Sequence, residues 1–428
     1  MDTMKVEIIG KEIIKPSAIT PTDLPPLQFS IMDIIMPPVY TVAFLFYTKD
    51  DLISQEQTSH TLKTSLSEIL TKFHPLAGRV NGVTIESNDE GAVFVEARVD
   101  NCNLSSFLRS PDTEFLKQLL PVDDEPAPTW PLLLVQATYF QCGGMAIGLC
   151  ISHKLADATS LSIFLQAWAA TARGESDSVA SPDFVSTKLY PAANEAIGIP
   201  KKDQVGKRTS VTKRFVFVES KIEELRNKVA SDVVPRPTRV QSVTSLIWKC
   251  VVTASTDTIR EKALFQPANL RPKIPSLLSE NQIGNLFFAT LTLDGKAGVD
   301  IVETVKELQK RAEELSGLVQ HEEGSSMTIG SRLFGEIINS KFNHEVHDMH
   351  SVTSWCKIPL YKACFGWGSP VWVAGSVSPN LDDVTVLIDS KDGQGIEAWV
   401  TLHQENMLLF EQSTELLAFA SPNPSVLI

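Results

Sequence analysis

The sequence predicts an α/β fold built from two domains, and three observations carry this prediction. A chain of 428 residues is too long for a single ordinary hydrophobic core, so two domains of about 200 residues each are expected. Strand and helix signals alternate through both halves without an internal repeat, which favours layers of sheet and helix over a bundle or a sandwich. From about Ser176 to Lys207 the sequence loses periodicity and becomes rich in polar residues and proline, as expected of a long connection.

In the first half, apolar runs predict strands at Val6–Ile14, Val93–Ala97, Leu132–Ala137 and Met145–Ser152. Apolar residues at helical spacing predict an amphipathic helix over about 59–72. A second helix is expected to begin at Ala158 and to end near Gly174.

The second half begins with a predicted strand at Lys213–Val218. Ser220 and Glu223 have the spacing of a capping box, so a helix is expected to follow, through about Val229. Two late runs, Val384–Ile388 and Ile396–Leu402, also read as strands. The glycines between them, Gly393 and Gly395, loosely match a dinucleotide fingerprint, but a strand follows them where a helix is needed, so a hairpin turn is favoured.

Composition excludes several classes of function. The formal net charge is −13, which argues against a nucleic-acid partner, because phosphate backbones attract clustered Lys and Arg. Six scattered cysteines without a CxxC pair form neither a disulfide framework nor a thiolate zinc site, and they fit a reducing compartment. The first residues lack the apolar core of a secretory signal, and the longest apolar stretch, Val39–Tyr47, is too short to span a bilayer. We therefore expect a cytoplasmic protein with no membrane partner.

The pentapeptide from His153 to Asp157 is the strongest candidate for chemistry. A neutral imidazole at the mouth of a buried strand can take a proton from an alcohol, and a nearby carboxylate can orient it. The alternative is structural: His153 would be hydrogen-bonded at a strand end, and Asp157 would cap the helix that begins at Ala158. Taken alone, the pentapeptide favours the structural alternative.

Two rival chemistries have weaker signals. The segment from His344 to His350 is rich in histidine, but its spacings of three and three differ from the spacing of a zincin helix, so a polar loop is favoured over a metal site. No Gly-x-Ser-x-Gly elbow occurs, so a serine hydrolase lacks its usual nucleophile context.

A second signature lies roughly two hundred residues downstream of His153, in the sequence Cys364-Phe365-Gly366-Trp367-Gly368. Alone it indicates a tight turn packed by aromatic rings. With His153 and Asp157 it resembles the plant BAHD acyltransferases, which carry HxxxD centrally and DFGWG near the C-terminus. Further segments that resemble the family, in particular its branch containing vinorine synthase, are Phe73–Arg79, Ser245–Lys249, Asn269–Arg271, Thr353–Trp355 and Glu397–Val400.

The resemblance implies two chloramphenicol-acetyltransferase-like domains, each a mixed sheet with helices, with a solvent channel between them. The expected boundaries are 1–175 for the N-terminal domain, 176–212 for the crossover connection and 213–428 for the C-terminal domain. It further implies that acyl-CoA, most simply acetyl-CoA, is a co-substrate, that no cofactor or metal is bound, and that the acceptor is the hydroxyl of an alkaloid or terpenoid. A monomer is expected.

The same resemblance assigns roles to residues. His153 would be the general base in a direct transfer and Asp157 its support, while Trp355 or Thr353 would stabilise the oxyanion. The implied CoA contacts are among the polar and basic residues Lys213, Arg214, Ser245, Lys249, Asn269, Arg271 and Lys273.

Cys364 departs from the family pattern, which has an aspartate there that is expected to pair with the arginine equivalent to Arg271. This departure motivates one alternative, a non-catalytic ligand-binding or regulatory relative. A second alternative is covalent catalysis, with Cys364 or Cys150 taking the acyl group. A metal-dependent hydrolase around His344 to His350 is the weakest alternative.

Overall fold

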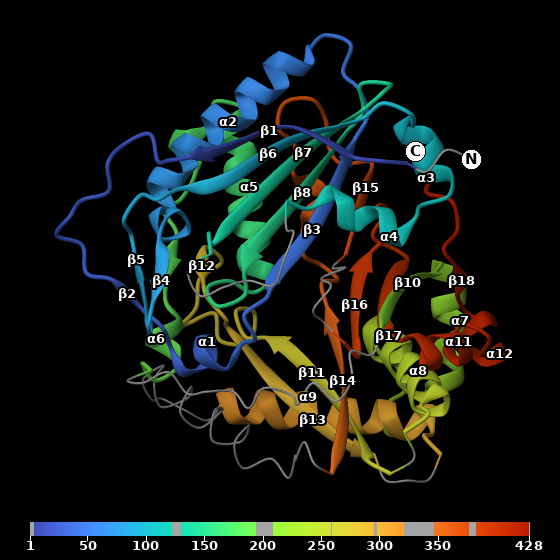
Figure 1. Cartoon of the computed structure of the whole chain (residues 1–428). Helices are drawn as coiled ribbons and strands as arrows, with labels where there is room; N and C mark the ends of the chain where they lie inside the picture. Colours follow the sequence, from blue (N-terminus) through green and yellow to red (C-terminus); the bar gives the residue numbers. More distant parts are fainter. Residues whose placement is uncertain are drawn as a thin grey trace.

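A computed structural model describes residues 4–121, 130–193, 209–257, 259–294, 298–320, 346–375 and 382–427. Two sheets dominate it: one in the upper half of Figure 1, built mainly from the N-terminal half, and one below it, built from the C-terminal half. Each sheet carries its own helices. The predicted two-domain α/β architecture with mixed sheets is confirmed.

The first sheet has six strands, and its hydrophobic core also takes in α2 (Gln55–Lys72) and α5 (Ala158–Ala172). Only β6 and β7 pair in parallel, so this sheet is largely antiparallel. In spatial order its strands are β1 (Glu7–Ile14), β6 (Ala92–Val99), β7 (Leu133–Phe140), β8 (Met145–Ser152), β3 (Tyr40–Tyr47) and β15 (Trp372–Ala374).

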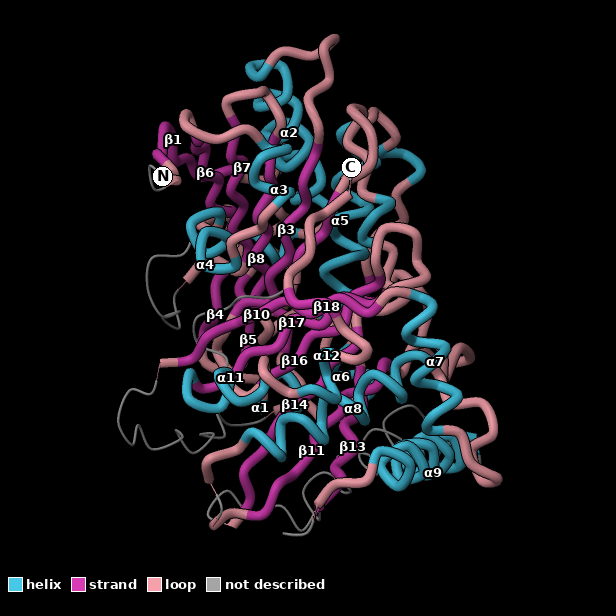
Figure 2. Tube along the Cα trace, turned by 90° about the vertical axis from the view of Figure 1, so that its right-hand side faces the viewer, coloured by secondary structure: helices cyan, strands magenta, loops and turns pink. Residues whose placement is uncertain are grey.

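The second sheet has seven strands, in the order β13 (Phe287–Asp294), β11 (Glu261–Asn269), β14 (His347–Ser354), β16 (Val384–Asp389), β17 (Ile396–His403), β10 (Ser210–Phe217) and β18 (Ser421–Pro422). Its core includes apolar residues of α7 (Glu219–Val229), α8 (Arg239–Ala254), α9 (Ile301–Gln320), α11 (Gln404–Phe410) and α12 (Thr414–Leu417). In Figure 2, α7 and α9 lie together at one side of this sheet.

Smaller elements complete the fold. A pair of two-residue strands, β9 (Asp183–Phe184) and β12 (Gln282–Ile283), runs in parallel, and β2 (Leu27–Gln28), β5 (Thr84–Glu86) and β4 (Arg79–Asn81) form a third sheet. Among the described residues, the remaining helices are α1 (Ile31–Ile35), α3 (Leu104–Arg109), α4 (Thr113–Leu116), α6 (Ser186–Leu189) and the short 3-10 helices His74–Ala77, Lys117–Leu119, Ser176–Ser178 and Leu360–Lys362.

Several local predictions are confirmed, and three need correction. α2 begins earlier than expected, because Ser54 and Gln57 form a complete capping box. The box expected from Ser220 and Glu223 is absent, since α7 begins at Glu219 after Val218 with no side-chain cap. The connection is not structureless over its described part, because β9 and α6 lie within it.

The chain does not divide cleanly at one point. β15 comes from the C-terminal half, yet it pairs with β3, and Phe365 lies in the core of the first sheet. The boundaries 1–175, 176–212 and 213–428 stay a prediction, and they do not describe this return of the chain.

Candidate active site

His153 is the first residue after β8, where its backbone N–H donates to the Val39 carbonyl over 2.9 Å. Its ring Nδ1 lies 3.1 Å from Oδ1 of Asn285, which belongs to the segment between β12 and β13. Burial lowers the pKa of His153, so the imidazole is neutral near pH 7. A neutral imidazole can accept a proton.

Asn285 determines which nitrogen of His153 carries the proton. The Asn285 side chain is fully buried, and its Nδ2 donates to the His153 carbonyl over 2.8 Å and to Asp33 Oδ1 over 2.9 Å. With the amide nitrogen committed to two acceptors, its oxygen faces His153 Nδ1, which must therefore be the N–H. The lone pair is left on Nε2.

The hydrogen-bond partners of Asp157 are residues other than His153, and its bonds have two structural roles. Its Oδ1 accepts from the Ser160 N–H over 2.8 Å and so caps α5, as the structural alternative expected. It also forms a bidentate ion pair with Arg271, with N–O distances of 2.8 and 3.2 Å. Burial of Asp157 raises its pKa, but the charge of Arg271 and the hydrogen bonds from Arg271 and Ser160 together outweigh burial, and the pKa ends below its ordinary value.

Arg271 therefore pairs with Asp157, an acid other than the aspartate that the family pattern has at position 364. All three guanidinium nitrogens are engaged, since further bonds go to Ser160 Oγ and to the carbonyls of Gln282 and Gly284. The group is 5% exposed. Arg271 joins the second half of the chain to the start of α5. Its predicted contact with CoA stays a prediction.

Cys364 has a different neighbour. Arg173, just beyond α5, donates from its guanidinium to the Cys364 carbonyl. Phe365 packs edge-on against Trp168 of α5 with ring centroids 4.8 Å apart, and Trp367 stacks on Phe365 at 5.6 Å. The positive φ angles of Gly366 and Gly368, 114° and 98°, allow the turn to be this tight. The segment is a structural turn that packs on α5, as its sequence alone suggests.

The two residues predicted to stabilise the oxyanion lie at the end of β14. Thr353 lies in β14, and Trp355 just after it is 5% exposed; neither is a partner of His153, Asn285 or Asp33 in the described part of the chain. Their role at the oxyanion stays a prediction.

The predicted CoA contacts lie at or just after the end of β11, in α8 and in β10. Asn269 is exposed at the end of β11, and its Nδ2 lies 3.3 Å from Thr159 Oγ1 near the start of α5. Ser245 is fully buried within α8, and Lys249 of the same helix pairs with Glu415 over 2.7 Å. Two further basic residues are also paired, Lys213 with Glu411 and Arg214 with the buried Glu397. Lys273 is exposed.

Two site residues were missed from the sequence, Asn285 and Asp33. Asn285 gave no motif, because its contact with His153 spans 132 residues of chain. Asp33 had a visible signal: it stands three residues after Ser30, the spacing of the capping box that opens α1.

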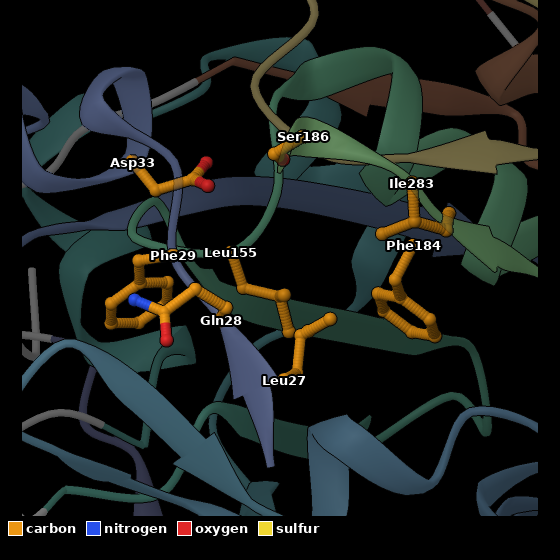
Figure 3. A pocket seen from close by; sticks show the side chains of 8 residues that line it. All are labelled: Leu27, Gln28, Phe29, Asp33, Leu155, Phe184, Ser186 and Ile283. Atoms are coloured by element: carbon orange, nitrogen blue, oxygen red, sulfur yellow. The ribbon is translucent and has the colours of Figure 1, made fainter. Parts of the chain in front are cut away.

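Asp33 is also one of the residues that line a small pocket. Figure 3 shows it lined by the apolar side chains of Leu27, Phe29, Leu155, Phe184 and Ile283, with Gln28, Asp33 and Ser186 as its polar members. His153 is not among the residues that line this pocket.

Metal chemistry has no support in the described part of the chain. No group of three or more His, Cys, Asp or Glu side chains there is arranged to hold an ion. His347 and His350 lie in β14, while His344 and Glu345 fall outside the described residues. No helix among the described residues is long and apolar enough to cross a membrane.

Comparison with known proteins identifies the family of this chain. A family model described as "Transferase family" matches residues 4–417. The BAHD acyltransferase BIA1 of Arabidopsis thaliana is 41% identical over 440 residues, covering 99% of each chain. The chain belongs to the BAHD family of acyl-CoA-dependent acyltransferases.

Two further relatives help to place it within the BAHD family. A limonoid 21-O-acetyltransferase of Melia azedarach is 34% identical, with 99% of this chain and 100% of the relative covered. The crystal structure of vinorine synthase superposes with a TM-score of 0.81 at 30% identity, covering 97% of this chain and 99% of that one. The predicted family and its vinorine-synthase-like branch are confirmed.

Proposed function

We propose that this acyltransferase moves an acetyl group from acetyl-CoA to a hydroxyl of an alkaloid or terpenoid, with His153 as general base. The observation that carries the proposal is the contact between His153 Nδ1 and Asn285 Oδ1, which leaves Nε2 as the proton acceptor. The names of the relatives, which include a limonoid acetyltransferase and a stemmadenine O-acetyltransferase, support the acetyl donor and this class of acceptor.

The reaction proceeds by direct transfer while both substrates are bound. His153 Nε2 takes the hydroxyl proton as the alcohol oxygen attacks the thioester carbonyl, which gives a tetrahedral oxyanion and an imidazolium. Collapse of the oxyanion breaks the C–S bond, and the imidazolium returns the proton to the CoA thiolate. Trp355 or Thr353 is proposed as the donor to the oxyanion, at the channel expected between the domains.

Covalent catalysis by a cysteine is the less favourable chemistry. Cys150 is fully buried in β8, and burial raises the pKa of its thiol well above the ordinary value. A thiol of this kind is a poor nucleophile. Cys364 is engaged in the turn that packs on α5, away from the contacts of His153.

Product analysis tests the proposal. The purified chain is incubated with acetyl-CoA and with longer acyl-CoAs, each with a panel of alkaloid and terpenoid alcohols, and free thiol and product mass are recorded. We expect equal amounts of thiol and acetylated alcohol. Binding of CoA without thiol release would indicate a non-catalytic relative, and an acylated cysteine in rapid-quench mass spectrometry would indicate covalent catalysis.

Gel filtration tests the expected monomer, and fluorescent tagging in cells tests the expected cytoplasmic location.

A further inference from the structure

Asp33 is a buried carboxylate that the reaction scheme does not use, yet it is one contact away from the histidine. It lies in α1 and is 2% exposed. Its Oδ2 accepts from the backbone N–H and the hydroxyl of Ser30, over 2.9 and 2.8 Å, while its Oδ1 accepts from Asn285 Nδ2 over 2.9 Å. Both oxygens act as acceptors, which is the behaviour of an ionised carboxylate.

We propose that Asp33 is a positioning residue that sets the tautomer of His153 through Asn285. If the Asn285 amide were turned over, its oxygen would face two acceptors, Asp33 Oδ1 and the His153 carbonyl, and its nitrogen would point a donor at His153 Nδ1. Such an arrangement would favour the Nε2–H tautomer, which cannot accept the hydroxyl proton. The charge on Asp33 makes the wrong orientation unfavourable.

The contacts around Asp33 support its role as a positioning residue. Lys154, the residue after His153, donates from Nζ to the Ile34 carbonyl over 2.6 Å, which holds α1 against the loop that carries the histidine. Burial raises the pKa of Asp33 to about 6, against hydrogen bonds from Asn285, Ser30 and Ser186 that lower it. The carboxylate is therefore ionised near pH 7.5, where it can act as the acceptor.

Asp33→Asn is the test, because it keeps the shape and removes the charge. An amide at position 33 can no longer accept on both sides, so Asn285 loses its fixed orientation. We expect kcat to fall roughly tenfold to a hundredfold, by analogy with the partners that orient metal-binding histidines, with KM within about threefold. Ser30→Ala is the matched control, since it removes a bond to Asp33 Oδ2 and leaves the Asp33–Asn285 bond intact.

A double-mutant cycle shows whether Asp33 acts on His153 through Asn285 or only stabilises the fold. In an Asn285→Ala background, Asp33→Asn should lower kcat no further, because the group through which Asp33 acts is absent. Equal losses of kcat in both backgrounds, with thermal unfolding checked for each variant, would overturn the proposal.

Nitrogen-15 NMR of histidine-labelled protein reads the tautomer directly, with His153→Gln used to assign the signal. We expect Nδ1–H in the wild type and in Ser30→Ala, and a mixture or the Nε2–H form in Asp33→Asn. The proposal would be overturned if His153 carried its proton on Nε2 in the wild type, or if its tautomer were unchanged in Asp33→Asn. If Asp33→Asn does not fold, the wild-type spectrum alone tests the proposal. The kinetic arm rests on the proposed function, whereas the NMR arm needs no substrate, so the two can fail separately.

Discussion

At the scale of single residues, the two halves of the HxxxD motif serve different purposes. His153 faces Asn285 and is left with a basic Nε2, whereas Asp157 faces Arg271 and caps α5. The carboxylate does not contact the imidazole that its spacing suggests it would orient. The carboxylate linked to His153, through Asn285, is Asp33.

Asp157→Asn should lower the free energy of unfolding by about 3–5 kcal/mol, because it leaves the buried guanidinium of Arg271 without its counter-charge. Asn still caps a helix, so the loss reports the ion pair. Asp300→Asn is the control: it changes a cap of α9 whose oxygen accepts from the N–H groups of Val302 and Glu303. Urea denaturation measures both, and equal losses would contradict the assigned role.

The same pair predicts a pH dependence. The folded-state pKa of Asp157 lies below its ordinary value of 3.8, so its stabilising effect is complete above that pH and is lost as the pH falls through the folded-state pKa. The difference in unfolding free energy between wild type and Asp157→Asn should therefore be constant near neutral pH and should shrink below about pH 4. A difference that grew on acidification would be inconsistent with this ion pair.

At the scale of elements, sequence patterns predicted the helices and strands whose formation depends on residues close together in the sequence. The runs that gave β8, β16 and β17 are apolar and bounded by turn residues, and α5 has an acidic cap, so these elements were found. Elements that depend on distant partners were missed. β9 is two residues long and exists because β12, about a hundred residues later, pairs with it.

The turn from Cys364 to Gly368 should tolerate change at its first residue and not at its second. Phe365→Ala removes a fully buried ring from the face of α5 and should lower the unfolding free energy by about 3–5 kcal/mol. Cys364→Ser, whose main contact here is through the carbonyl, should cost less than about 1 kcal/mol and leave the transfer rate within about twofold. Loss of transfer in Cys364→Ser would revive covalent catalysis.

At the scale of the whole molecule, the two sheets are joined by buried charge as well as by β15. Glu397 of β17 accepts from Arg214 of β10 over 2.7 and 2.8 Å, and it also accepts from the indole N–H of Trp372 over 3.2 Å. Trp372 belongs to β15 in the first sheet, and Arg214 lies over its ring at 5.2 Å. No local sequence pattern predicts this junction, since its members come from three separate strands.

Glu397→Gln should lower the free energy of unfolding by about 3–5 kcal/mol, because it leaves Arg214 buried and unpaired. Glu411→Gln is the matched control. It breaks the pair with Lys213, the preceding residue on β10, but that pair is partly exposed and should be worth less than about 1 kcal/mol. Urea unfolding followed by tryptophan fluorescence measures both variants. If Glu397→Gln and Glu411→Gln lowered the free energy of unfolding equally, the junction around Glu397 would not be an important source of stability.

The central claim is that His153 is the base of an acyl transfer, and the turnover of His153→Ala tests it most directly. At saturating acetyl-CoA and acceptor, kcat should fall by about 10²–10⁴-fold, while CoA affinity by calorimetry and the thermal midpoint stay unchanged. His60→Ala, on the exposed surface of α2, should retain wild-type turnover. Near-normal turnover in folded His153→Ala that still binds CoA would contradict the account.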